Sequence, residues 1–138
     1  MTKSIDDACK EIQTIVLAVS GIQAAPDYPP DKISQYPVSV CFAGSGNIKP
    51  TSGGGVEGLH QITLELHYPA KNRARAVEVL NPLARLIYRA LFSDSNFSLN
   101  STIDTINEIS YEFGPLGYDS VDTIGYTFTI DVKIRETL

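Results

Sequence analysis

The fold is decided by the stretch DTIGYTFTIDVKIR, which runs from Asp122 to Arg135. Its even positions are apolar: Ile124, Tyr126, Phe128, Ile130, Val132 and Ile134. Its odd positions are small or polar: Gly125, Thr127, Thr129, Asp131, Lys133 and Arg135. Because successive side chains of a strand point to opposite faces, the stretch predicts a strand with one apolar face. Partner strands must cover its edges, and helices must cover that face.

The size and composition are those of one globular domain. The chain has 138 residues, of which 43% are hydrophobic and 20% charged, and residues 1–138 are expected to form a single domain. The net charge of −5 argues against binding nucleic acid or an anionic membrane through a basic face. Cys9 and Cys41 are expected to be buried free thiols. No apolar run approaches the roughly 18 residues of a membrane span, and no signal peptide is apparent, so synthesis in a cytoplasm is expected.

Two amphipathic helices are predicted. Ser4 is a candidate N-cap for a helix over Ile5–Ser20, whose apolar residues fall on one stripe. Asn72 is a candidate cap for a second helix that reaches Leu91. Pro82 lies inside this pattern, so either the helix is kinked and nearly continuous there, or Asn81 caps a new helix. The apolar stripe stays in phase across Pro82, which favours the kinked helix.

Three further strands complete the sheet. They are predicted over Pro37–Ala43, Leu59–Tyr68 and Thr102–Phe113. In Thr102–Phe113 the isoleucines recur every three residues, so a helix is the alternative there. Between the first two lies Gly44–Gly58, with six glycines in fifteen residues, which predicts a long flexible hairpin tip. The order α-β-β-α-β-β predicts an α+β fold: a four-stranded, mainly antiparallel sheet with two helices on one face. The Asp122–Arg135 strand, about 45 Å long, exceeds what Pro37–Ala43 can match, so part of it is expected to run past its own domain.

No stretch carries a catalytic or metal-binding motif. Gly53–Gly58 matches G-x-G-x-x-G, but a loop precedes it and a strand follows, so we expect no dinucleotide site. His60 and His67 are seven apart on one strand, so they point to opposite faces and are expected to be partly exposed. Asp104, Glu108 and Glu112 share one face if the strand is regular, but lie too far apart for a two-carboxylate active site. We therefore expect no enzyme, no cofactor and no metal.

Charge is distributed in a way that permits assembly. Five cations lie at the start and on the surface of the second helix: Lys71, Arg73, Arg75, Arg85 and Arg89. They are either ordinary surface residues or partners for acidic residues of a neighbouring subunit. A protein with an acidic sheet face and a basic helix face can assemble head-to-tail, and a ring forms if the rotation closes.

The whole pattern resembles the tail terminator, or tail-completion, proteins of long-tailed bacteriophages. The resemblance rests on the N-terminal helix, the connector Ala25–Pro30, the strand entry Tyr36–Val40, the long glycine-rich hairpin, the helix Arg73–Leu91 and the strand that ends at Ile134. It covers nearly the whole chain in length and order of elements, and no single residue is diagnostic.

The resemblance implies a structural virion protein of the tail or neck. Members form a hexameric ring that caps the tail tube protein, stops its polymerisation and offers a docking surface to the head–tail connector proteins, while DNA passes through the hole without specific binding. It makes Asp104, Glu108 and Glu112 candidates for the lumen, and the five cations candidates for subunit or connector contacts. A candidate assembly loop comprises Ser45, Asn47, Ile48, Lys49, Thr51, Val56 and Glu57. The alternatives are another neck or tail-tube component and a small-molecule-binding ferredoxin-like α+β domain.

Overall fold

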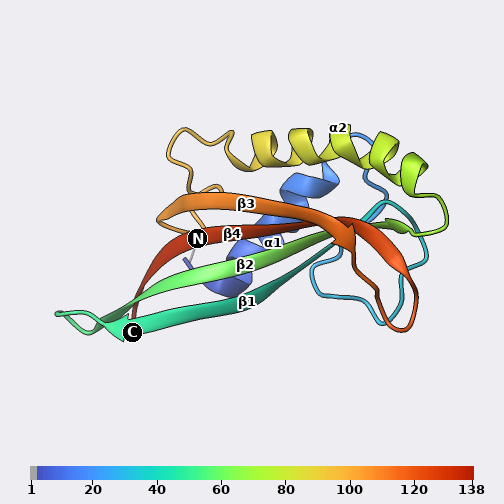
Figure 1. The fold of residues 1–138 in the computed structure, drawn as a ribbon. Coiled ribbons are helices and arrows are strands. Elements are labelled where there is room, and N and C mark those ends of the chain that lie inside the picture. The colour runs from blue at the N-terminus through green and yellow to red at the C-terminus, as the bar shows by residue number, and fades with distance from the viewer. Residues whose placement is uncertain (1–2) are drawn as a thin grey trace.

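The computed structural model describes residues 3–138 and has six elements (Figure 1). In chain order they are α1 (Ile5–Leu17), β1 (Val38–Pro50), β2 (Gly55–Pro69), α2 (Arg73–Leu91), β3 (Thr105–Pro115) and β4 (Thr123–Thr137). The strands form one sheet in the order β1-β2-β4-β3, and every neighbouring pair is antiparallel. The predicted α+β class and the order α-β-β-α-β-β are confirmed.

The core lies between the helices and one face of the sheet, called here the inner face. Leu64 of β2 and Phe128 of β4 are partners in the sheet register, and both are fully buried. They pack in one cluster with Ile12 of α1 and Ile87 of α2, so both helices cover the same face. β4 is a central strand, flanked by β2 and β3. The alternation that predicted this strand therefore also identifies its buried side.

The flexible hairpin tip predicted over Gly44–Gly58 is wrong. β1 and β2 pair as far as Pro50 and Val56, and the turn is confined to residues 51–54. The glycines have another cause: a Cβ built on Gly46 or Gly58 would lie 2.9 Å or 2.2 Å from the imidazole of His60. The missing side chains at these two positions make room for the His60 ring on the inner face. The two glycines therefore serve packing, and not the mobility that the sequence pattern suggested.

The prediction that part of β4 runs past its own domain is also wrong. β1 is longer than the predicted Pro37–Ala43, and β2 pairs with β4 along its whole length, up to Gly55 opposite Thr137. In Figure 1 the hairpin of β1 and β2 extends with the end of β4 beyond the region that the helices cover. The long strand is therefore matched within its own chain.

Both helix caps are confirmed, although α1 is shorter than predicted. The Ser4 hydroxyl accepts a hydrogen bond from the Asp7 amide, and the Asn72 side chain accepts one from the Arg75 amide. α1 ends at Leu17, three residues before Ser20. α2 is one helix through Pro82, so a fresh helix capped by Asn81 is excluded. Neither helix in residues 3–138 is long and apolar enough to cross a membrane.

The ambiguous stretch Thr102–Phe113 is a strand, with an irregularity that matters for the site. β3 spans Thr105–Pro115, so the helical alternative is wrong. Its register against β4 shifts between Ile106 and Glu108. Asn107 is the extra residue of this β-bulge, and a bulge reverses the alternation of side chains on either side of it.

Candidate functional site

The face of the sheet opposite the helices, called here the outer face, carries a group of carboxylates. Glu108 lies directly opposite Asp131 in the register, while Glu65 and Glu112 lie on either side of Thr127. Among residues 3–138, no lysine or arginine forms an ion pair with any of these four acids. Like charges directly opposite one another destabilise a sheet. The four acids are called here the acidic patch.

Asp131 is the least satisfied member of the acidic patch. Its Oδ1 is buried and has no hydrogen-bond partner. A buried oxygen left without a partner costs free energy, on the order of 1–3 kcal/mol. Asp131 was predicted on the polar face of its strand but not as a site residue, because its proximity to Glu108 depends on the pairing of β3 with β4.

The prediction that Asp104 shares a face with Glu108 and Glu112 is wrong. Asp104 precedes β3 and lies on the other side of the bulge at Asn107. Its carboxylate binds the Lys3 ammonium at 2.6 Å and accepts a hydrogen bond from the Arg135 amide at 2.5 Å. Asp104 thus ties the start of the chain to β4. Glu108 and Glu112 are exposed on the outer face and remain lumen candidates.

The cations of the outer face gather near the tip of the hairpin. Glu57 lies 3.6 Å from the Lys133 ammonium and 3.3 Å from the Arg135 guanidinium. Desolvation raises the pKa of the Glu57 carboxyl, but these cations together lower it more, so that this pKa lies below its usual value. Lys49 lies directly opposite Glu57 on β1. The outer face is therefore acidic in the middle and carries mixed charge, with more cations than anions, at the hairpin end.

The residues of the candidate assembly loop lie on ordered strands, with one exception. Ser45, Asn47, Ile48 and Lys49 are exposed on β1, which is an edge strand. Val56 and Glu57 are half-buried on β2, and only Thr51 lies in the turn. These residues remain candidates for assembly, but as a protruding rigid ribbon rather than a mobile loop.

The five predicted contact cations are all exposed, but two of them already have partners. Arg75 forms an ion pair with Glu78 at 2.9 Å, and the Arg73 guanidinium lies 5.6 Å from the centre of the Phe113 ring. Lys71, Arg85 and Arg89 form no ion pair with the described residues. Arg85 lines a groove of about 270 Å³ between α2 and β3 with Tyr88 and Tyr111.

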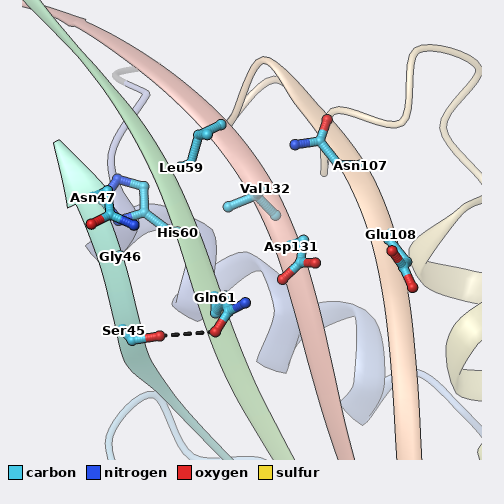
Figure 2. A pocket seen from close by; sticks show the side chains of 10 residues that line it. All are labelled: Ser45, Gly46, Asn47, Leu59, His60, Gln61, Asn107, Glu108, Asp131 and Val132. Atoms are coloured by element: carbon cyan, nitrogen blue, oxygen red, sulfur yellow. Dashed lines mark hydrogen bonds between the residues drawn. The ribbon is translucent and has the colours of Figure 1, made fainter. Parts of the chain in front are cut away.

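A depression of about 510 Å³ crosses all four strands, and Glu108 and Asp131 of the acidic patch line it. Figure 2 shows a row of polar side chains across this depression, one from each strand: Ser45 of β1, Gln61 of β2, Asp131 of β4 and Glu108 of β3. The Ser45 hydroxyl donates a hydrogen bond to Gln61 Oε1 at 2.9 Å. Among residues 3–138, no group of three or more His, Cys, Asp or Glu side chains has a geometry that could hold a metal ion.

The two histidines lie on opposite faces as predicted, but neither is partly exposed. His60 is 9% exposed and His67 is fully buried. The ring of His67 forms hydrogen bonds with the Thr123 hydroxyl at 2.7 Å and with Glu65 at 2.9 Å. Tyr118 packs edge-on against the same ring. The segment before β4 thus covers one end of the outer face. The periodicity of the β2 sequence does not predict this burial of His67.

The comparisons with known proteins identify no family for this chain. No protein-family model matches the chain, and no curated protein matches it. The residues and their geometry are therefore the basis for inferring a function.

Proposed function

We infer that this protein is a ring-forming tail terminator of a long-tailed bacteriophage. In this role it caps the tail tube, stops its polymerisation and forms the docking surface for the head connector. The observation that best supports this is the acidic patch on a sheet face that no helix covers. Carboxylates that line a channel repel the phosphates of DNA, so DNA slides through without being held. Glu108 and Glu112 are the proposed lumen residues.

The exposed stretches of the two edge strands support assembly of several copies. β1 and β3 are the two edge strands. Main-chain hydrogen bonds from the segment between α1 and β1 cover the start of β1: the Ser39 amide donates to the Ala24 carbonyl, and the Gln23 amide donates to the Pro37 carbonyl. The residues from Phe42 to Pro50 are exposed. Exposed edges are templates for pairing with another chain, and a head-to-tail contact that repeats closes into a ring when the rotation allows.

The cations of α2 lie on the helix side of the molecule, away from the acidic patch. Arg85 and Arg89 are proposed to contact a neighbouring subunit or the connector, since both are exposed and neither forms an ion pair within residues 3–138. The ribbon formed by the ends of β1 and β2 is proposed to reach the tail tube or a ring neighbour, because it protrudes beyond the helices (Figure 1).

Mass and binding test the proposal together. Light scattering and negative-stain imaging should find a ring of about six subunits with a central hole, either free or on the tube. Mixing the protein with purified tail tubes should place it at one tube end and stop further growth. A protein that stays monomeric and does not bind tube ends would overturn the proposal. Incorporation along the tube would instead indicate a tail-tube component.

One observation favours a second candidate, a small-molecule-binding α+β domain. The depression of about 510 Å³ gathers polar side chains from four strands. Such a domain would bind its ligand as a monomer, and a ligand should shift the amide NMR signals of Gln61 and Asp131. A screen of small polar metabolites that shifts neither residue would exclude this candidate.

A further inference from the structure

The contact between α1 and β1 is fixed by a buried polar pair. The Gln13 side chain donates to the Ser39 carbonyl at 2.8 Å and accepts from the Ser39 hydroxyl at 2.6 Å. Cys9 lies four residues before Gln13, about 6 Å along the helix. Two residues after Ser39, on the same face of β1, is Cys41, about 6.6 Å along the strand. The two steps nearly match, so the two thiols face each other across the contact.

The surroundings of the two thiols differ in a way that suits stepwise chemistry. Cys41 is 2% exposed, whereas Cys9 is half-buried. Both line an opening of about 220 Å³ with Tyr28 and Pro29, which gives a reagent access to Cys9. The neighbouring Cys41 thiol lowers the pKa of Cys9 in spite of burial and of Asp6. The same contact, together with burial, raises the pKa of Cys41. Cys9 is thus both the accessible sulfur and the better thiolate.

We propose that Cys9 and Cys41 are a modification site at which a small-molecule disulfide, such as oxidised glutathione, produces an intramolecular disulfide that links α1 to β1. In the first step Cys9 loses its proton to solvent, and its thiolate attacks one sulfur of the reagent. The S–S bond of the reagent breaks, a mixed disulfide forms on Cys9, and the first thiolate leaves and takes up a proton.

In the second step Cys41 loses its proton to solvent and attacks the Cys9 sulfur. The bond between Cys9 and Cys41 forms, and the second glutathione thiolate leaves and is protonated. The protein loses two protons and two electrons, and the reagent is reduced to two thiols. The link closes a loop that holds the proline-rich connector and the start of β1. Such a loop closure should raise the Tm by about 10 °C.

The test uses the full chain and oxidised glutathione as the probe. After incubation, thiol titration should fall from two thiols to none, and intact mass should fall by two hydrogen atoms. Peptide mapping should recover Cys9 linked to Cys41, and dithiothreitol should reverse all three changes. A wild-type protein that stops at a stable glutathione adduct on Cys9, forms only intermolecular dimers, or does not react would overturn the proposal.

Two variants separate the steps. Cys41→Ser should stop at the glutathione adduct on Cys9, and Cys9→Ser should not react, since Cys41 is buried. Circular dichroism identifies a variant that fails to fold, and the wild-type peptide map decides the question without either variant. Unfolding of the oxidised and reduced wild type, measured at the same pH, gives the shift in Tm. No shift, or a lower Tm after oxidation, would contradict the proposed link between α1 and β1.

Discussion

At the scale of single residues, two glycines that lie opposite each other have opposite requirements. Gly125 of β4 is buried, and a Cβ built on it would lie 1.7 Å from the Leu66 carbonyl oxygen. Its register partner on β3, Gly114, has no atom within 4 Å of the same position. The sheet therefore has no room for a side chain at position 125, whereas position 114 has room for one.

We therefore predict that Gly125→Ala destabilises the fold by about 3 kcal/mol, because β2 and β4 must move apart to admit a methyl group. Gly114→Ala is the matched control and should change stability by no more than about 1 kcal/mol in either direction. Urea unfolding followed by circular dichroism measures both. Equal effects for the two variants would contradict the close approach of β2 to Gly125.

Gln13 is the second residue on which the fold depends. It is 1% exposed, and besides Ser39 it donates to the Pro26 carbonyl at 2.8 Å, so one side chain joins α1, β1 and the proline-rich connector. Gln13→Ala leaves the Ser39 hydroxyl and two carbonyls without these partners, and should cost about 3 kcal/mol in chemical denaturation. Thr14→Ala is the control. Thr14 is exposed, so this substitution should lower the free energy of unfolding by no more than about 0.5 kcal/mol. A similarly small cost for Gln13→Ala would mean that water replaces the lost bonds.

At the scale of elements, the ribbon of β1 and β2 is the part that the proposed function needs most. Deletion of Pro50–Gly55, which a flexible tip would tolerate, would remove the whole turn, the pairing of Pro50 with Val56 and the pairing of Gly55 with Thr137. A cleaner change replaces Lys49–Glu57 with Asn-Gly, since Ile48 and Gly58 are register partners and a two-residue Asn-Gly turn joins antiparallel strands.

We predict that this shortened variant folds but no longer binds tail tubes. The core cluster lies between the helices and the rest of the sheet, so the circular dichroism spectrum should be preserved. Binding is measured by counting capped tube ends in electron micrographs, with Ser52→Ala in the turn as a control that should cap normally. A shortened variant that still caps tubes would show that the ribbon is not the docking element.

At the scale of the whole molecule, the separation of charge predicts how copies associate. The acidic patch is on the outer face, and the exposed arginines of α2 are on the helix side. Unlike Arg75, which is paired with Glu78, Arg85 has no ion-pair partner among the described residues. A charge that is unpaired within the chain is available to a neighbouring chain.

Arg85→Glu should therefore weaken ring assembly by at least about tenfold, because it replaces an attractive contact with a repulsive one. Arg75→Glu is the matched control, with the same change of charge on the same helix at an arginine that already has a partner. Light scattering across a dilution series gives the concentration at which each ring dissociates. Equal dissociation for both variants would place Arg85 on an ordinary surface.

The sequence by itself determined the features that arise from neighbours along the chain. Alternation in Asp122–Arg135 was enough to predict a strand and its buried face, because side-chain direction has a period of two. The caps at Ser4 and Asn72 were predictable because they act within one turn of helix. Together these local signals gave the α+β class and the order of the elements.

Only the tertiary structure decided what depends on contacts between distant residues. The glycines at positions 46 and 58 are explained by the His60 ring, not by flexibility. The bulge at Asn107 separates Asp104 from Glu108, and the pairing of β3 with β4 brings Asp131 beside Glu108. The contact of Cys9 with Cys41 depends on how α1 lies on β1. A one-residue shift in register reverses every side chain beyond it, so faces and sites across strands require the fold itself.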